Sequence, residues 1–516
     1  MKNLPIGIQT LPKLIESNCV YIDKTQQIHQ LITTGKYYFF SRPRRFGKSL
    51  LISTLKEIFQ GNKTVFKDLW IENNWAWSKS SPVLHFSFDG LGYDKLGLDN
   101  CLIRTLKEKA KDFEVVLSNV SDTKVLFVEL IKNVAQKHGK VVLLIDEYDK
   151  PIIDYLEFSK IDLAKTNRDI LREFYGAVKS SDEFLEFVFI TGISKFAKIS
   201  LFSHLNNLDD ITIDSKYATL AGYTQSEIEF YFEDYLQEIQ NKLSFTREQI
   251  LDYMKIWYNG YSWDGVSRVY NPFGTLNFLS KGQFKNFWFS TGNPRFLIEQ
   301  MREKEMYNVE NVIVDSIVLE KYDLENIDLI PLLFQTGYLT IKTLDPMTGE
   351  MVMDYPNKEV RESMYNFLIG DLARNPKRTS TGRTFSDLSK AVLANDLKQV
   401  REIIDAILAD LPSEVFKQKS EGLFHGLVHL IFSYLGVFIS SEVHSSRGRA
   451  DAIVETPTNI YVFEFKFNKT AQEAIDQIRE RKYSDKYQVS RKKIVAIGVN
   501  FNSHEKKIDE WLEVNI

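Results

Sequence analysis

The sequence has little of what would place the chain in a membrane, a secreted scaffold or a fibre. It contains 2 cysteines, Cys19 and Cys101, which are too few for a disulfide framework or a structural zinc site. It has no run of about eighteen apolar residues, and its N-terminus lacks the basic and apolar regions of a signal peptide. Only 13 prolines and 25 glycines occur, which excludes collagenous and low-complexity classes. We expect a cytoplasmic protein with no membrane partner.

Charge of one sign is not in excess either. Lys and Arg number 65 against 69 Asp and Glu, a formal net charge of -4, so the chain as a whole does not attract nucleic acid. Because salt screens charges beyond about 10 Å, a local basic patch can still bind phosphate. Hydrophobic residues make up 44% and charged residues 26% of the 516, values typical of globular proteins. This length predicts roughly two to four domains.

The first half of the chain alternates between strand and helix patterns. This alternation favours a mostly parallel sheet with helices on both faces. The expected strands are rich in β-branched and aromatic residues and cover 37–40, 83–88, 141–145 and 187–191. Helices are expected between them, for example over 50–59 and 170–179.

The string RPRRFGKS at 42–49 follows the first of these strands and precedes an apolar-periodic helix. Strand, loop, Gly-Lys-Ser and helix is the order of a phosphate-binding loop. Lys48 would neutralise the β- and γ-phosphates, and the Ser49 hydroxyl would bind Mg²⁺. The strict motif wants glycine where Arg42 stands, so a basic turn that caps a helix is the alternative interpretation.

An acidic pair ends the apolar strand 141–145. Parallel strands bring their carboxyl ends to the edge where ligands bind, so Asp146 would reach Mg²⁺ and Glu147 would polarise the attacking water. Thr191, at the end of another strand, would sense the γ-phosphate. The alternative is a core strand that ends in a polar loop. The residues assigned to nucleotide binding are Arg44, Arg45, Phe46, Gly47, Lys48, Ser49, Asp146 and Thr191.

Two strands near the C-terminus, 450–455 and 460–467, are separated by a short turn-like loop. If Glu455 pairs with Ile460, Asp451 lies opposite Glu464, and the period of two places Lys466 on the same face. The phenylalanines at 463, 465 and 467 then point to the other face. Two carboxylates and a lysine would converge.

Two carboxylates this close require a cation, so the hairpin predicts a Mg²⁺ or Mn²⁺ site. Asp451 and Glu464 would hold the metal, and Glu421 would reach it from an upstream helix. Lys466 would help to deprotonate water or would stabilise the pentavalent charge. A solvent-facing hairpin of mixed charge is the alternative. Contacts to nucleic acid are expected from a downstream helix at Gln477, Arg479, Arg481 and Lys482.

Several strings resemble a known family. RPRRFGKS, DEYDKP at 146–151 and TGISK at 191–195 resemble bacterial AAA-ATPase-like proteins that carry a C-terminal nuclease-like domain. WYNGY at 257–261 and TGNP at 291–294 are similar to further strings of that family. There the first glycine of the loop is typically replaced, which accounts for Arg42. The pattern Asp451, Glu464-x-Lys466 resembles the PD-(D/E)XK nuclease superfamily. The resemblance implies ATP binding and a full nuclease set.

The expected fold is α/β, with four parts. Residues 1–223 would form a P-loop core with a parallel sheet, 224–300 a helical lid, 301–378 a small winged-helix-like connector with a hairpin near 345–349, and 379–516 an α/β PD-(D/E)XK nuclease-like domain. A polar linker is expected at 375–382.

These patterns predict a protein that binds and hydrolyses ATP and thereby regulates a Mg²⁺-dependent endonuclease-like domain. Its partner would be nucleic acid, DNA in preference to RNA, and its use would be defence against phage or mobile elements. The alternatives are a nucleotide-switched interaction protein that binds nucleic acid or a protein without cleaving, and a plain ATPase with an inert appendage. Assembly into a homo-oligomer stays open.

Overall fold

The computed structural model divides the chain into two compact units. The first comprises Met1–Gly292 and Asn311–Glu359, and the second comprises Asn293–Glu310 and Val360–Ile516. The four-part division expected from the sequence stays a prediction. The structure describes residues 1–194, 207–289, 295–304, 306–320, 328–372, 381–409, 421–436, 440–443, 451–487, 490–505 and 507–516.

The first unit contains a parallel sheet of five strands in the order β2-β3-β4-β1-β5. Strand β3 is buried along its whole length, as expected for a parallel strand covered on both faces. The four strands expected from the sequence are confirmed. The bounds of the five strands are Tyr37–Ser41 for β1, Val83–Ser87 for β2, Val141–Asp146 for β3, Leu185–Gly192 for β4 and Asp209–Asp210 for β5.

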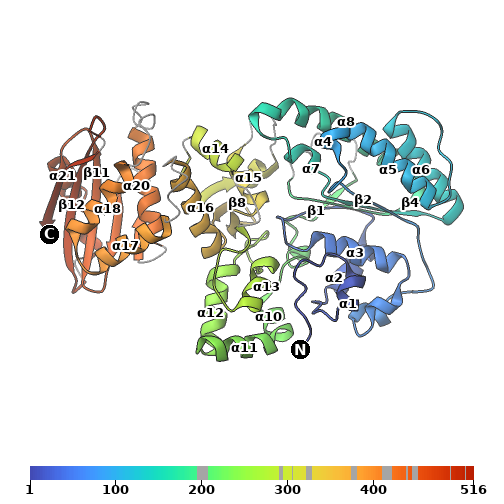
Figure 1. The fold of residues 1–516 in the computed structure, drawn as a ribbon, viewed down its shortest axis with the longest axis horizontal. Helices are drawn as coiled ribbons and strands as arrows, with labels where there is room; N and C mark the ends of the chain where they lie inside the picture. Colours follow the sequence, from blue (N-terminus) through green and yellow to red (C-terminus); the bar gives the residue numbers. More distant parts are fainter. Residues whose placement is uncertain are drawn as a thin grey trace. The chain divides into compact units, whose positions relative to one another are not determined.

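Helices cover both faces of this sheet, as Figure 1 shows. The helices α1, α2 and α3 lie on one face, and α5, α6 and α8 lie on the other. All strands being parallel, the carboxyl ends of β1, β3 and β4 meet at one edge, where a ligand site is expected. The bounds of the helices are Leu11–Glu16 for α1, Thr25–Thr34 for α2, Lys48–Phe59 for α3, Leu98–Asp112 for α5, Thr123–His138 for α6 and Ile161–Ser180 for α8.

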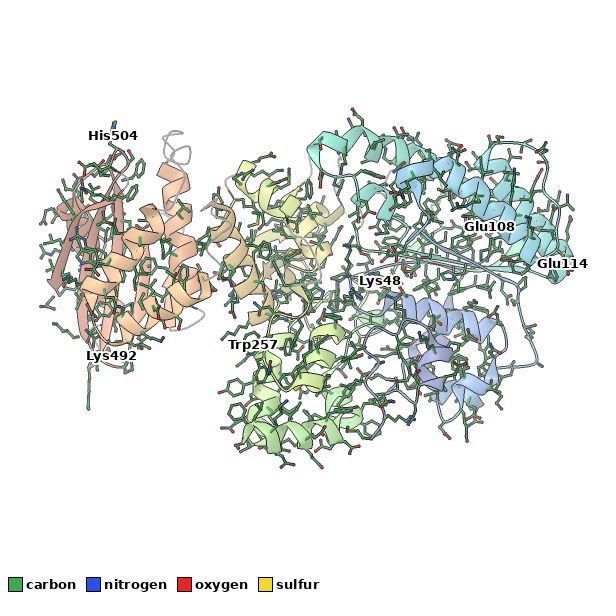
Figure 2. All side chains as sticks on the ribbon, viewed as in Figure 1. Lys48, Glu108, Glu114, Trp257, Lys492 and His504 are labelled. Atoms are coloured by element: carbon green, nitrogen blue, oxygen red, sulfur yellow. The ribbon has the colours of Figure 1, made fainter. Side chains whose placement is uncertain are left out.

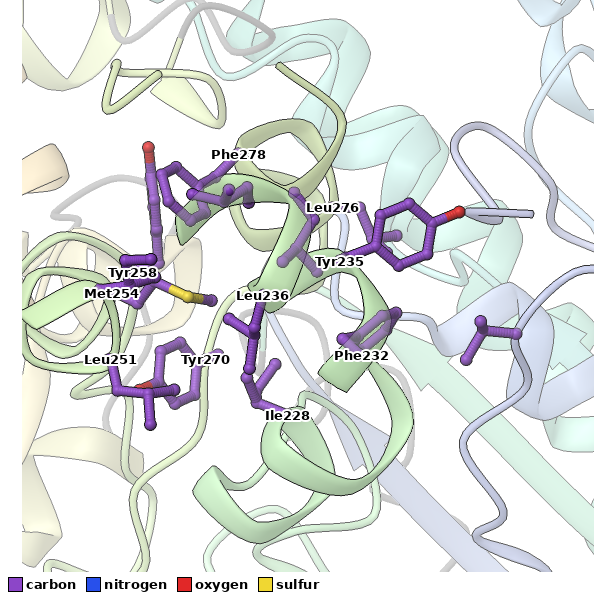
Figure 3. Packing of buried hydrophobic residues seen from close by; sticks show 14 of the residues in the cluster. Ile228, Phe232, Tyr235, Leu236, Leu251, Met254, Tyr258, Tyr270, Leu276 and Phe278 are labelled. Atoms are coloured by element: carbon purple, nitrogen blue, oxygen red, sulfur yellow. The ribbon is translucent and has the colours of Figure 1, made fainter. Parts of the chain in front are cut away.

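A helical region follows the sheet and has a core of its own. Side chains such as Leu236, Met254 and Phe278 converge in it (Figure 3). Two of its helices begin with capping boxes, at Thr224 and at Thr246, which explains why they start where they do. The helices are α10 (Gln225–Tyr231), α11 (Glu233–Leu243), α12 (Arg247–Tyr258) and α13 (Pro272–Lys281).

A small antiparallel sheet completes the first unit, with strand order β6-β8-β7. The hairpin expected near 345–349 is confirmed as β7 (Thr340–Leu344) and β8 (Glu350–Asp354), whereas the strand β6 (Val312–Asp315) was not expected. Helix α15 (Leu329–Thr336) precedes the hairpin, and α16 (Lys358–Leu372) follows it. Helix α16 begins in the first unit and continues in the second.

The second unit has a mixed sheet in the order β13-β12-β11-β10-β9, in which only the β11–β12 pair is parallel. The part of the expected linker that the structure describes, 381–382, belongs to helix α17, which corrects that end of the linker. The elements are α17 (Thr381–Leu393), α18 (Leu397–Ala409), α20 (Glu421–Leu435), β9 (Ser440–Val443), β10 (Ala452–Glu455), β11 (Asn459–Phe467), α21 (Ala471–Glu480), β12 (Lys493–Asn502) and β13 (Lys507–Asn515).

Helix α20 is apolar but has only 15 residues. It buries Phe432 against Phe463 and Phe465 of β11. Within the described ranges, none of the helices combines the length and the hydrophobicity needed to span a bilayer.

Candidate functional site

A pocket of about 310 Å³ lies where the loop after β1 and the end of β3 meet the start of α3. This volume is in the range of small-molecule sites. Its lining includes four cations and two carboxylates, so the pocket attracts an anion. The charged and hydroxyl residues of the lining are Arg44, Arg45, Lys48, Ser49, Asp89, Glu147, Lys150 and Tyr223.

The loop before α3 is shaped to present backbone N–H groups. Gly47 has φ 90° and Arg45 has φ 69°, so both lie in the left-handed region, which is open to glycine and costs other residues energy. Among the described side chains, none caps the start of α3. The first N–H groups of the helix are therefore available to a phosphate.

Lys48 is buried at this edge of the sheet, and Figure 2 labels it. Its ammonium donates to the carbonyls of Arg42 at 2.8 Å and of Pro43 at 3.0 Å. Burial lowers the pKa of Lys48, while the carboxylates of Asp146 and Glu147 oppose this shift. A phosphate would restore the solvation that burial removes, so the ammonium favours an anionic ligand.

The structure separates the two acidic residues at the end of β3. Glu147 lines the pocket, has φ 55°, and has its pKa raised by burial against the opposing charge of Lys48. Asp146 is not part of the lining and accepts a hydrogen bond of 2.6 Å from Thr191 Oγ1. Thr191 is fully buried and is not part of the lining. The role of Thr191 as a phosphate sensor stays a prediction.

Phe46 contributes to the pocket wall differently from its neighbours. Its ring is buried in the core against Tyr261, with a centroid distance of 4.8 Å, and against Trp263 at 5.5 Å. The side chain anchors the loop to the segment before α13. Phe46 does not line the polar pocket but belongs to the lining of an apolar cavity beside it.

Arg42 occupies the position of the missing glycine, and its side chain is fully buried. The guanidinium lies over the rings of Phe40 and Trp263, 4.3 Å and 3.9 Å from their centroids. It donates to the carbonyls of Thr212 at 2.7 Å and Tyr217 at 3.2 Å. Burial lowers the pKa of Arg42 to about 9. Arg42 thus points into the protein interior, and the loop keeps its shape without the glycine.

An apolar cavity of about 80 Å³ adjoins the polar pocket. Pro5, Leu50, Tyr223 and Pro272 line both, so the two spaces share a wall. Lys24 closes the apolar cavity with an ion pair of 2.5 Å to Glu227. A ligand with a planar apolar part and an anionic tail would match the two spaces.

The C-terminal hairpin has the register that the sequence predicts. Glu455 pairs with Ile460 and Ala452 with Phe463, which brings Asp451 to the position opposite Glu464. Asp451 Oδ2 accepts a hydrogen bond of 2.8 Å from the backbone N–H of Phe465. The two carboxylates therefore occupy neighbouring strands at the same level.

Lys466 and Gln477 join Glu464 in one hydrogen-bond network. Lys466 Nζ donates to Glu464 Oε1 at 3.1 Å and to Gln477 Oε1 at 2.5 Å. Gln477 Nε2 donates to Glu464 Oε1 and, at 3.3 Å, to the hydroxyl of Tyr483. Both bonds to Glu464 use the same oxygen, Oε1.

The second oxygen of Glu464 is buried and makes no hydrogen bond within the described chain. The pKa of Glu464 is raised to about 7, because burial and the charge of Asp451 raise it and Lys466 opposes the rise only in part. An unpaired buried carboxylate oxygen is costly, and a cation would satisfy it. The residues therefore fit a divalent metal.

The third carboxylate of the expected metal site is not tested. Glu421 is the first residue of α20, and its side chain lies outside the described residues. Side chains that the structure does describe include no group of three His, Cys, Asp or Glu that could hold a metal. The described part of the site is the pair Asp451 and Glu464.

Gly498 sets the distance between α21 and the sheet. A Cβ at this residue of β12 would come within 2.3 Å of the carbonyl of Ala471, so a larger residue would displace the helix that carries Gln477. Arg479, Arg481 and Lys482 follow at the end of α21 and are exposed to solvent. They are free to contact phosphates, in keeping with their predicted role.

Comparisons with known proteins match both regions. A family model described as a predicted AAA-ATPase matches residues 5–202, and a model of the PD-(D/E)XK nuclease superfamily matches residues 419–511. A protein of Azotobacter chroococcum, described as an uncharacterized protein in the vnfD 5′ region, is 36% identical over 522 residues and covers 98% of each chain. The chain belongs to the AAA-ATPase-like family with a C-terminal PD-(D/E)XK nuclease domain.

A likeness to a solved structure is much weaker. The ORC1 protein of Aeropyrum pernix, solved in complex with DNA, aligns with 67% of this chain and 93% of its own at 9% identity. The TM-score is 0.25, too low to support any conclusion about this member of the family.

Three residues of the candidate sites had not been singled out from the sequence. Asp89 and Lys150 line the pocket, and Tyr483 hydrogen-bonds Gln477. Asp89 follows strand β2, so the rule that polar residues end parallel strands could have found it. Tyr483 carries no such signal. The strings TGISK and TGNP extend, at 195 and at 291–294, outside the described residues.

Proposed function

We propose that the protein binds and hydrolyses ATP in the first unit and that ATP controls a metal-dependent nuclease in the second. The observation that supports the first half is the cationic pocket over the Gly47 loop, next to an apolar cavity. The triphosphate would occupy the polar part and the base the apolar part. The match to a predicted AAA-ATPase supports ATP as the ligand of the first unit, and the match to the PD-(D/E)XK nuclease superfamily supports a nuclease in the second.

In the first unit, Lys48 would leave the carbonyls of Arg42 and Pro43 and bind phosphate oxygens. Glu147 lines the same pocket, and its pKa is raised. It would orient a water molecule beside the phosphates and accept its proton. Ser49 and Asp146 would hold Mg²⁺, which neutralises phosphate charge. Thr191 would keep the Asp146 carboxylate oriented through the bond already present.

In the second unit, the supporting observation is the unpaired buried oxygen of Glu464 opposite Asp451. These two carboxylates would hold Mg²⁺ or Mn²⁺, which binds a phosphodiester oxygen and lowers the pKa of water. Gln477 positions Lys466, which as a neutral amine would accept a proton from water or as an ammonium would stabilise charge on phosphorus. Arg479, Arg481 and Lys482 would contact the backbone of the nucleic acid, which we propose is DNA.

Defence against phage or mobile DNA is the cellular role we propose. It rests on the pairing of a nucleotide-dependent module with a nuclease in one chain. A nuclease of this kind must stay inactive on host DNA, and control by ATP would supply that restraint.

Two measurements test the proposal. Titration of the full chain with MgATP should show binding, and Lys48→Met should weaken it by about 10- to 100-fold, because a charge-assisted contact to phosphate is lost. The matched control is Lys63→Met, an exposed lysine away from the pocket. Equal affinities for the wild type and the Lys48 variant would contradict the assignment of the pocket.

Cleavage is measured on plasmid, single-stranded DNA and RNA, with Mg²⁺ or Mn²⁺ and with or without ATP. We expect metal-dependent cleavage of DNA that changes with ATP and is lost in Lys466→Met. If the wild type binds nucleic acid with an affinity that depends on ATP but never cleaves it, the nucleotide-switched interaction protein replaces the nuclease.

A further inference from the structure

Trp288 connects the phosphate-binding loop to the start of α16. Its indole Nε1 donates to the carbonyl of Arg44 at 3.0 Å, and Arg44 lines the pocket. Its backbone N–H donates to Oε1 of Glu359 at 2.6 Å. Glu359 belongs to the first turn of α16. One residue thus holds the loop with its side chain and the helix with its backbone.

The surroundings of Trp288 leave it little freedom. Its ring contacts Tyr338 with a centroid distance of 5.4 Å, and only 5% of the residue is exposed. At Gly337, with φ 90°, a Cβ would come within 2.8 Å of Pro43 and 3.3 Å of the Trp288 ring. Because packed interiors deform little, a shift of the loop must move Trp288.

The other partner of Trp288 is a buried carboxyl group. Glu359 is fully buried, and burial raises its pKa to about 8, against the opposing effect of the backbone N–H groups of residues 287–289. Its Oε2 lies against Gly274, where a Cβ would approach it to 3.1 Å. The Oε2 atom makes no hydrogen bond within the described chain, whereas Oε1 accepts the hydrogen bond from Trp288.

The contacts of Lys48 link ligand binding to the loop that Trp288 holds. Without ligand, Lys48 holds the carbonyls of Arg42 and Pro43. A phosphate competes for the same ammonium and releases these carbonyls, which directly precede Arg44. Binding of nucleotide would therefore change the loop beside the carbonyl of Arg44, which accepts the hydrogen bond from Trp288. The loop would then make different contacts with and without ATP.

We propose that Trp288 is a positioning residue that transmits the occupancy of the nucleotide pocket to α16. The route runs from Arg44 through Trp288 to Glu359, entirely within the first unit. Because α16 continues into the second unit, its first turn lies on the covalent path to the nuclease domain. The inference rests on the proposed function, since it takes ATP as the ligand of the pocket.

The test is hydrogen–deuterium exchange of the full chain, with and without saturating MgATP. In the wild type, ATP should slow exchange in peptides that cover the first half of α16 by about fivefold, the effect of one stabilised hydrogen bond. Trp288→Phe keeps an aromatic ring and loses the indole N–H, so its α16 should no longer respond. The matched control is Trp77→Phe, because Trp77 Nε1 also donates to a carbonyl, that of Glu72, at 2.8 Å.

A pair of variants at Glu359 tests the same route without changing Trp288. Glu359→Gln keeps an oxygen acceptor in a neutral side chain and should keep the response of α16. Glu359→Leu is similar in size, removes the acceptor, and should lose the response. Loss in both variants, or retention in both, overturns the inference.

Other outcomes also decide the matter. If the wild type binds ATP by calorimetry but α16 does not respond, or if α16 still responds in Trp288→Phe, the inference is wrong and ATP binding stands. A folded Trp288→Phe variant that no longer binds ATP overturns it as well, because Trp288 would then control affinity. If the wild type binds no ATP, the proposed function itself fails.

Discussion

The two candidate sites are each built around a partly or fully buried lysine, but the neighbours of the lysine differ. Lys48 donates to backbone carbonyls in a pocket whose lining has more cations than carboxylates. Lys466 donates to Glu464, whose second oxygen stays unpaired in the described structure and whose neighbour is a second carboxylate. The first site therefore favours an anionic ligand and the second favours a cation. The same residue type serves opposite ligands because of what surrounds it.

The largest effect is expected from a variant that disrupts the metal site at Glu464. Glu464→Gln keeps the size of the side chain but removes the charge that holds the metal, so Mn²⁺ affinity and cleavage rate should each fall by on the order of 10³-fold. Calorimetry and a plasmid cleavage assay measure the two quantities. Glu402→Gln, an exposed change in α18, is the control. Unchanged Mn²⁺ binding in the Glu464 variant would show that the metal site lies elsewhere.

A second variant tests whether Arg42, which is buried, stabilises the fold, whereas the other cations of the loop line the pocket. Arg42→Met should lower the free energy of unfolding of the first unit by about 3 kcal/mol, because it removes the hydrogen bonds to the carbonyls of Thr212 and Tyr217 and a buried guanidinium stacked on two rings. Urea unfolding followed by tryptophan fluorescence reports on this unit, which contains six of the 7 tryptophans. The exposed Arg104→Met is the control, and equal stability of both variants would contradict the interpretation.

The hairpin site was the part most accessible from the sequence. Its loop length and the period of two along a strand fix which residues face each other, so the register from Glu455 and Ile460 followed from local rules. The strands of the parallel sheet were equally visible, because buried strands are continuous apolar runs.

Contacts between distant segments could not be predicted in this way. The orientation of Arg42 depends on Trp263 and Tyr217, and the inward turn of Phe46 depends on Tyr261. No local pattern links residues so far apart in the chain. For the same reason the sequence marked Asp146 and Thr191 separately but not the hydrogen bond between them.

A pH series distinguishes the two sites with an effect of intermediate size. The pKa of Glu464 is raised to about 7 in the folded chain, above its unfolded value, so the folded state binds a proton more tightly. Without metal, the second unit should lose about 2 kcal/mol of stability as pH rises from about 5 to 7, as the unfolded state loses that proton first. Thermal unfolding with EDTA measures this slope.

Metal should reverse the trend, because Mn²⁺ competes with the proton and binds more tightly as pH rises. Glu464→Gln should flatten the slope in the absence of metal. If the wild type and this variant show the same dependence on pH, another group controls the titration and the carboxylate pair is not the origin of the metal preference.

The smallest effect concerns how the anion pocket distinguishes ATP from ADP. Lys150 lines the polar pocket but not the apolar cavity, and its ammonium makes only loose ion pairs, 3.7 Å to Asp89 and 3.4 Å to Asp154. With the base in the apolar cavity, Lys150 would contact the far end of the triphosphate. Lys150→Met should therefore lower the preference for ATP over ADP by about fivefold, the size of one exposed charge contact. Calorimetry with both nucleotides measures this ratio, and Lys160→Met, whose lysine pairs with Glu157 at 3.3 Å, is the control. Equal losses for ATP and ADP would place Lys150 near the inner phosphates instead, and the base would then have to lie outside the apolar cavity.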